Sequence, residues 1–261
     1  MIRIIICLLL VPGWSGAQSV DRLLAECQVK GSVTTLDPQT GHWSFTDSLD
    51  ATRSSQPAST FKIINLLVAL ETGIITSADD TIRWPGHTDT VLYGYRPEIY
   101  HDMTVREAFR ESAGWVFIEL AKRIGRGQYQ YYLHRSGYGN GDLSEKGDDF
   151  WNFGAFGVSP VQQVKFIERM LKYDLPFSRR NIDVLKDVMN QEDFSGGRIY
   201  HKTGWTRIAG QDIGWWVGYY TTSNRTVIFA TRIQKSRSVR TDSFGDCRKT
   251  ITRSFLSNLL Q

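Results

Sequence analysis

The sequence predicts an α+β fold, in which an antiparallel sheet is flanked by terminal helices and carries an inserted helical lobe. Segments rich in β-branched and aromatic residues lie near both ends of the chain, at about 29–48 and 198–233. Residues from about 74 to 190 have mostly helical patterns. Strands grouped at the two ends, with helices grouped between them, are typical of this fold class.

The first 17 residues have the pattern of a secretory signal peptide. Arg3 precedes an apolar run over 4–11, and small residues lead to a cleavage site near Ala17. The run is too short to cross a membrane as a helix, and an N-terminal core strand is the alternative. Residues 18–261 are expected to form one domain, periplasmic or secreted, with no membrane span.

The mature chain is predicted to begin with a short helix over 19–27 and a β-hairpin. Strand-like runs at 29–37 and 42–48 are joined by Pro38-Gln39-Thr40-Gly41, which is a turn signal. Residues 48–58 have the composition of a polar loop. A helix follows from Ser59 and ends at Gly73, a residue suited to a helix C-terminus.

Further helices and then strands are predicted beyond residue 74. Thr104 is a good N-cap for the first of two helices within 103–125. Ser223-Asn224 is expected to turn the last two strands into a hairpin. The remaining predicted elements are a helix at 159–173, strands at 198–205, 213–222 and 225–233, and a final helix at about 245–259.

Composition excludes several functions. The chain has 31 Lys and Arg and 27 Asp and Glu residues, which are interspersed, so no nucleic-acid-binding surface is predicted. The five histidines show no metal-binding spacing, so no metal site is predicted. Cys7 lies in the signal peptide, which leaves Cys27 and Cys247; a disulfide between them and two buried free thiols are the alternatives.

The helix that starts at Ser59 joins a serine and a lysine to an otherwise apolar sequence. Ser59 and Lys62 share one helix face, and unpaired N–H groups at a helix N-terminus can stabilise an oxyanion. A nucleophilic serine needs a base, and lysine becomes one only when burial lowers its pKa from about 10.4. The pattern therefore indicates a nucleophile and its base, with a capping serine and a snorkelling lysine as the alternative.

Other segments make this pattern specific. Lys202-Thr203-Gly204 lies on a predicted strand, and S-x-x-K with K-T-G marks serine β-lactamases and penicillin-binding proteins. Their order and spacing resemble those of class D β-lactamases, the oxacillinases, over nearly all of the mature chain. The matching segments are Ser59–Lys62, Ser112-Ala113-Gly114, Tyr138-Gly139-Asn140, Phe150–Gly154, Lys202–Trp205 and Trp215–Gly218.

The resemblance implies a transpeptidase-like fold and a serine β-lactamase that hydrolyses penicillin-type antibiotics and confers β-lactam resistance. Ser59 would form the acyl-enzyme. Lys62 would be carbamylated by carbon dioxide or bicarbonate, with no other cofactor, and would act as general base for acylation and deacylation. Trp151 would donate its indole N–H to the carbamate, since a tryptophan indole is a donor only.

The resemblance also assigns the remaining site residues. Ser112, aided by Lys202, would pass a proton to the leaving nitrogen, and the backbone N–H groups of Ser59 and Trp205 would form the oxyanion hole. Arg248 would hold the substrate carboxylate with a bidentate fork, although Arg232, Arg237, Arg240 and Arg253 are close in sequence. The predicted substrate-binding residues are Thr203, Gly204, Trp205 and Arg248.

One position departs from the family pattern. The family has Ser-x-Val where this chain has Ser112-Ala113-Gly114. A valine would keep the lysine pocket dry, whereas glycine leaves space for water or for Trp115. We therefore expect weaker protection of the carbamate and a greater dependence on added bicarbonate.

Two other functions use the same residues. A β-lactam sensor domain would be acylated without turnover, and a peptidoglycan carboxypeptidase or transpeptidase would need neither the carbamate nor Trp151. Tyr138-Gly139-Asn140 also occurs in class C enzymes and some carboxypeptidases, where the tyrosine is the base; a structural role in the loop is the alternative. Neither the range of β-lactam substrates nor the oligomeric state follows from the sequence.

Overall fold

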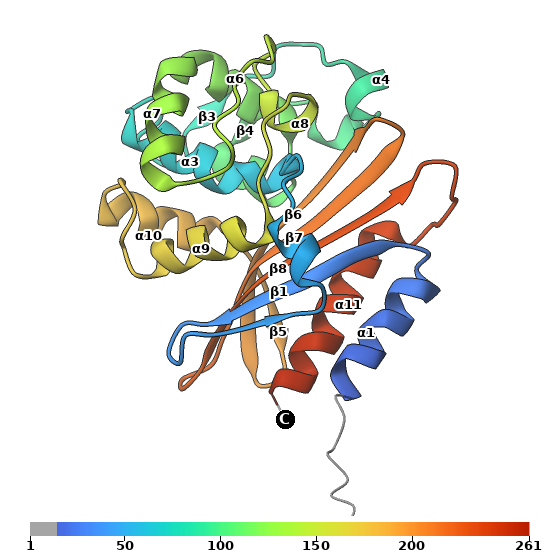
Figure 1. Ribbon diagram of the computed structural model, residues 1–261. Coiled ribbons are helices and arrows are strands. Elements are labelled where there is room, and N and C mark those ends of the chain that lie inside the picture. The colour runs from blue at the N-terminus through green and yellow to red at the C-terminus, as the bar shows by residue number, and fades with distance from the viewer. Residues whose placement is uncertain (1–14, 261) are drawn as a thin grey trace, which may run out of the picture.

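A six-stranded antiparallel sheet forms the centre of the protein, whose computed structural model describes residues 15–260 (Figure 1). The strand order is β2-β1-β8-β7-β6-β5, so both ends of the chain build one sheet, which confirms the α+β prediction. Most of the predicted signal peptide, residues 1–14, lies outside the described residues. The strands are β1 (Lys30–Asp37), β2 (His42–Phe45), β5 (Asn190–Phe194), β6 (Gly197–Ile208), β7 (Gln211–Thr221) and β8 (Thr226–Ser236).

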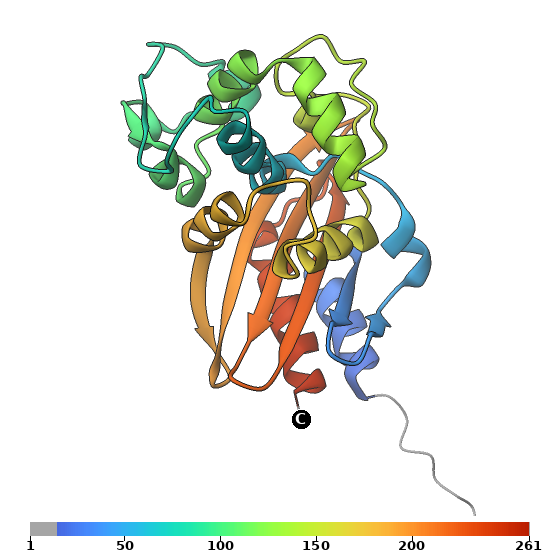
Figure 2. The ribbon, with the colours of Figure 1, turned by 90° about the vertical axis from the view of Figure 1, so that its left-hand side faces the viewer.

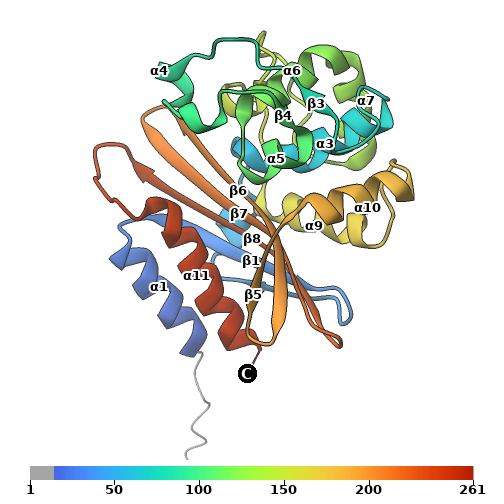
Figure 3. The same ribbon diagram turned by 180° about the vertical axis from the view of Figure 1, so that it is seen from behind.

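Helices cover both faces of the sheet. Helices α1 (Ser15–Glu26) and α11 (Phe244–Leu259) lie side by side on one face (Figures 1 and 3). Helix α9 (Pro160–Leu171) packs on the opposite face (Figure 2). Alternate residues of a strand point to opposite faces, so Trp215 of β7 joins the core under the helical lobe and Trp216 joins the core under α11.

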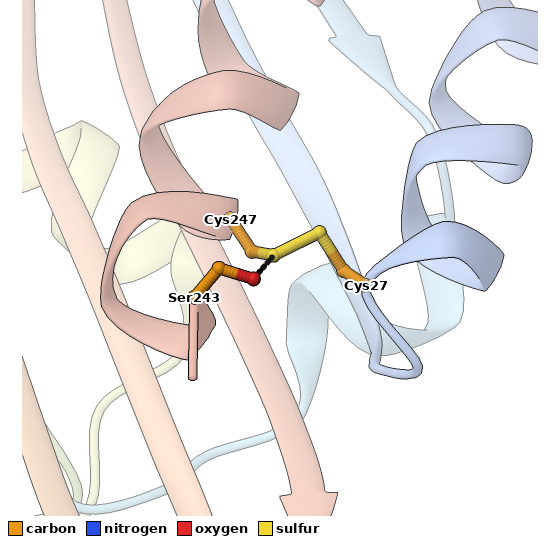
Figure 4. The surroundings of a disulfide bond; sticks show 3 residues. All are labelled: Cys27, Ser243 and Cys247. Atoms are coloured by element: carbon orange, nitrogen blue, oxygen red, sulfur yellow. Dashed lines mark hydrogen bonds between the residues drawn. A yellow bond between two sulfur atoms is a disulfide. The ribbon is translucent and has the colours of Figure 1, made fainter. Parts of the chain in front are cut away.

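A disulfide links helices α1 and α11, which lie on the same face of the sheet. Cys27, just after α1, is bonded to Cys247 in the first turn of α11, with 6.1 Å between the Cα atoms (Figure 4). This settles the choice that the sequence left open between a disulfide and two free thiols. The bond ties the end of α1 to the helix that carries Arg248.

The segment between β2 and β5 is mostly helical, and its central part forms the upper lobe in Figure 1. It contains the predicted 74–190 span and also two helices before it. Along residues 15–260, no helix combines the length and the apolar character needed to traverse a bilayer. The helices of this segment are α2 (Ser48–Thr52), α3 (Lys62–Glu71), α4 (Thr90–Tyr93), α5 (Val105–Arg110), α6 (Gly114–Ile124), α7 (Arg126–Ser136), α8 (Phe150–Phe153), α9 and α10 (Arg179–Val188), with the short 3-10 helices η1 (Ala58–Phe61) and η2 (Pro97–Ile99) and the strand pair β3 (Thr81–Ile82) and β4 (Met103–Thr104).

Three of the elements that the sequence patterns did not predict individually have a clear physical reason. Helix α2 lies in the predicted polar loop, because the Asp47 side chain accepts hydrogen bonds from two N–H groups of its first turn. Helix α7 has few apolar residues, and only Tyr129, Leu133 and Ser136 are buried, so it lacks a clear apolar stripe. Strand β5 is polar, as suits the edge strand of a sheet.

Candidate active site

A pocket of about 420 Å³ lies between the helical lobe and β6. Its walls come from η1, the segment around α4, the start of α6, α8, β6 and α11. Trp151 and Lys202 are buried and do not line it. The other predicted site residues all line this pocket: Ser59, Lys62, Ser112, Thr203, Gly204, Trp205 and Arg248.

Ser59 and Lys62 meet at the junction of η1 and α3. Ser59 lies in the 3-10 turn and Lys62 is the first residue of α3, where its Nζ lies 2.9 Å from Ser59 Oγ. The lysine is only 2% exposed, and its Nζ lies over the ring of Phe117. Burial, with a smaller contribution from the positive charge of Arg96, lowers the pKa of Lys62 to about 7. A large neutral fraction at neutral pH makes this amine a competent base for the serine hydroxyl.

The loop before Ser59 is held from the sheet and from the helical lobe. The indole of Trp215 on β7 donates a 2.9 Å hydrogen bond to the carbonyl of Gln56, and the Gln56 side chain donates a 2.8 Å bond to the carbonyl of Gly154. Ala58 has φ of +51°, a left-handed conformation that costs free energy in a residue with a side chain. The surrounding hydrogen bonds therefore keep Ser59 in one position.

Strand β6 faces the serine turn along an edge without a partner strand. Strand β7 pairs with β6 along its whole length, whereas β5 pairs with it only as far as His201. Beyond that residue η1 approaches, and a Cβ on Gly204 would lie 2.8 Å from the carbonyl oxygen of Pro57. Glycine is thus required at 204, and the backbone of 203–205 borders the pocket beside Ser59.

Ser112 and Lys202 form a second serine–lysine pair, 90 residues apart in sequence. Lys202 Nζ donates a 3.0 Å hydrogen bond to Ser112 Oγ. Burial, followed by the charges of Lys62 and Arg248, holds the pKa of Lys202 well below its usual range. Ser112 has φ of +59°, so its backbone is also left-handed, and both site serines lie in or beside strained backbone. The pair can carry a proton between the pocket and the buried amine.

Arg248 reaches the pocket from α11. Its Nη1 donates to the carbonyl of Gly204, and although burial lowers its pKa to about 10, it remains charged at neutral pH. The structure places the other arginines elsewhere: Arg232 is buried against Asp50, Arg253 is paired with Glu192, and Arg237 and Arg240 are exposed beyond β8. Arg248 is therefore the arginine of this group that lines the pocket.

Trp151 packs near the start of α3. Its ring stacks on Phe61 at 4.8 Å, and Phe61 immediately precedes Lys62. Within residues 15–260 its indole nitrogen has no hydrogen-bond acceptor, although the side chain is 1% exposed. A tryptophan indole is a hydrogen-bond donor only, so a ligand that accepts this hydrogen bond would be favoured here.

Gly114 lines the same pocket as Lys62, and the space left by its missing side chain is open. A Cβ at this position would meet no atom within 4 Å. Trp115 does not fill the gap, because its indole donates a 2.7 Å bond to the Ile99 carbonyl and its ring packs on Trp84. The sequence alternative in which Trp115 occupies this space is therefore wrong.

Tyr138 has a structural role in this site. It is buried, and its hydroxyl donates to Gln163, whose side chain donates in turn to Thr60 beside the nucleophile. Burial holds the pKa of Tyr138 well above its usual range, which opposes a role as base. Sequence reasoning missed Arg96, which lines the pocket from the loop after α4, because nothing in the local pattern of this loop indicates where it lies.

Comparisons with known proteins agree with this geometry. Residues 31–257 match the family described as the penicillin binding protein transpeptidase domain. The probable β-lactamase YbxI of Bacillus subtilis (strain 168) is 34% identical over 186 residues, which cover 71% of this chain and 67% of that protein. β-Lactamase OXA-48 of Klebsiella pneumoniae is 30% identical over 244 residues, 93% of this chain and 88% of that one.

Two further similarities complete the comparison. The regulatory protein BlaR1 of Bacillus licheniformis is 32% identical over 77% of this chain, which spans only 33% of that protein. The crystal structure of the class D β-lactamase YbXI from Nostoc has a TM-score of 0.83 at 32% identity, covering 92% of this chain and 98% of that one. The chain therefore belongs to the penicillin-binding transpeptidase family and, within it, to the class D serine β-lactamases.

Proposed function

We propose that this enzyme hydrolyses penicillin-type β-lactams through an acyl-enzyme on Ser59, with Lys62 as general base in its N-carboxylated form. The observation that supports this most strongly is the buried Lys62 amine, 2.9 Å from Ser59 Oγ, with a pKa of about 7. An amine with an ordinary lysine pKa would stay protonated, so it could neither accept the serine proton nor react with carbon dioxide.

The pocket contains the groups that acylation requires. Lys62 takes the proton of Ser59 as its oxygen attacks the β-lactam carbonyl, and the backbone N–H groups of Ser59 and Trp205 stabilise the oxyanion. The C–N bond of the ring then breaks, and Ser112 delivers a proton to the nitrogen while Lys202, 3.0 Å away, replaces it. Arg248, with the hydroxyl of Thr203, holds the substrate carboxylate.

The surroundings of Lys62 suit a carboxylate on its nitrogen. Only a neutral amine reacts with carbon dioxide, and the pKa of about 7 supplies that form. The unpartnered indole of Trp151 is a donor for an anion, and Gly114 leaves open space nearby. When present, the carboxylate supplies a general base that activates water for deacylation. The same surroundings let water reach it, which is why we propose a strong dependence on added bicarbonate.

The cellular role follows from this reaction. An enzyme exported after cleavage near Ala17 would meet penicillins in the periplasm and confer β-lactam resistance. Similarity to the regulatory protein BlaR1 supports a second candidate function, in which Ser59 is acylated without turnover. The two candidates differ in the fate of the acyl-enzyme.

Intact-mass spectrometry with benzylpenicillin, with and without bicarbonate, tests the proposal alongside substrate absorbance. We expect turnover with a transient adduct, faster in bicarbonate, and neither adduct nor turnover in Ser59→Ala. A stable adduct without turnover in both conditions would support the sensor function. Hydrolysis by Ser59→Ala would show that the nucleophile is a different residue.

A further inference from the structure

The pocket carries more positive charge than the proposed reaction uses. Among the lining residues, all within the described part of the chain, no side chain is acidic. The proposed reaction uses Lys62 as base and Arg248 for the ring carboxylate of the substrate. The basic side chains of the lining are Lys62, Arg96, Arg207 and Arg248.

Arg96 and Arg248 reach the pocket from different elements, the loop after α4 and helix α11. Arg248 contacts the carbonyl of Gly204 on β6. Arg96 Nη1 donates a 3.2 Å hydrogen bond to the carbonyl of Glu111, the residue before Ser112. The α4 segment that leads to Arg96 lies over the end of the sheet at which β6 turns into β7 (Figures 1 and 3). Arg96 is therefore held by the helical lobe and Arg248 is held against strand β6.

Arg96 keeps most of its hydrogen-bonding capacity. Its Nε donates to Glu98 at 2.8 Å, but these side chains are 39% and 58% exposed, and an exposed ion pair contributes little. No residue within 15–260 pairs with its Nη2 group. A guanidinium has five N–H groups in a planar fork, so Arg96 can still bind a carboxylate with two of them.

Arg207 is in a different state, although it lines the same pocket. It pairs with the buried Asp212 at 3.5 Å and lies over the ring of Trp205. This carboxylate is only 8% exposed and also pairs with Lys235 at 3.1 Å, so Arg207 already has a buried carboxylate partner, whereas the partner of Arg96 is the exposed Glu98. Arg207 is therefore the matched control for Arg96.

In a penicillin, the ring carboxylate and the acylamino side chain lie on opposite sides of the β-lactam carbonyl. With the carboxylate at Arg248 and the carbonyl at Ser59, the side chain extends away from Arg248. Arg96 lines the same pocket from the helical lobe and has N–H groups that no residue within 15–260 uses. We propose that Arg96 is a specificity-determining residue that binds a second carboxylate, so this enzyme favours penicillins whose acyl side chain is itself acidic. The proposal deepens the proposed function and rests on it.

Benzylpenicillin and its α-carboxy derivative carbenicillin differ by this one carboxylate and form the test pair. The measurement is kcat/KM for both at low ionic strength in the wild type, Arg96→Gln, Arg96→Lys and Arg207→Gln. The positive charge of Arg96 also acts on Lys62, but that effect applies to both substrates and cancels in the carbenicillin-to-benzylpenicillin ratio. Binding of both penicillins to Ser59→Ala, with and without Arg96→Gln, provides the same ratio without turnover.

We expect Arg96→Gln to lower the ratio by about tenfold, mainly through KM, since a charge-assisted pair in a partly exposed site is lost. Arg96→Lys should retain part of the preference for carbenicillin, and Arg207→Gln should change the carbenicillin-to-benzylpenicillin ratio by less than about twofold. An unchanged ratio in Arg96→Gln, or an equal fall in Arg207→Gln, would overturn the proposal. If the wild type does not hydrolyse benzylpenicillin at all, the proposed function is contradicted. The ratio of carbenicillin to benzylpenicillin binding in Ser59→Ala would still decide the role of Arg96.

Discussion

Acylation should depend on pH through the neutral fraction of Lys62. Burial lowers the pKa of this lysine from 10.5 to about 7. About half of the amines are then neutral at pH 7 and about 1% at pH 5, whereas an unperturbed lysine would be neutral in only about 0.03% of molecules at pH 7. Burial therefore raises the concentration of active base at neutral pH by about three orders of magnitude.

The neutral fraction of Lys62 can be followed through the rate of Ser59 acylation by benzylpenicillin. This rate is measured from pH 5 to 9 in carbon dioxide-free buffer. We expect it to rise about tenfold between pH 5 and 6 and to level off above about pH 8. Bicarbonate should raise the plateau and keep the acidic limb, because only the neutral amine is carboxylated. Rapid quenching followed by intact-mass spectrometry separates acylation from deacylation.

A flat profile between pH 5 and 8 would refute the assignment of Lys62 as base. A limb with an apparent pKa above about 9 would show that burial does not neutralise the amine. The same titration of Ser59→Ala measures any reaction that does not use the nucleophile. The Lys62→Met variant should show no acidic limb and little acylation.

Three other predictions follow from burial, the disulfide and the open space near the base. Because the folded-state pKa of Lys62 lies below its unfolded value, the unfolded chain binds more protons between about pH 7 and 10.5, so stability rises with pH through that window. Lys62→Met should therefore raise the free energy of unfolding by about 3–5 kcal/mol at pH 6 and by much less at pH 10, and equal gains in urea unfolding at both pH values would contradict this. Replacing Cys27 and Cys247 with serine should cost about 3–5 kcal/mol, because the bond closes a loop with a sequence separation of 220; an unchanged urea midpoint would argue against it. Gly114→Val should fit the open space and reduce the activation by bicarbonate, and equal activation in both proteins would show that this space does not expose the base.

Local sequence patterns were sufficient to predict most of the fold. Apolar periodicity and turn residues located the terminal strands, and Thr104 marked the start of α5. The apolar helix after Lys62 predicted the burial that lowers its pKa. These predictions succeeded because each depends on residues within a few turns of one another. Strand β5 is polar and helix α7 lacks a clear apolar stripe, so neither has the local apolar pattern on which these predictions depend.

The sequence by itself therefore determined the fold class, the pairing of Ser59 with a lysine three residues later and the resemblance that names the chemistry. Only the tertiary structure decided which distant groups meet. Lys202 contacts Ser112 because β6 extends past the end of β5, and Arg248 is selected among neighbouring arginines because α11 directs it at Gly204. Arg96 enters the pocket from a loop with no local signal. Contacts between residues far apart in sequence depend on how helices and sheet pack, and no short-range period encodes them.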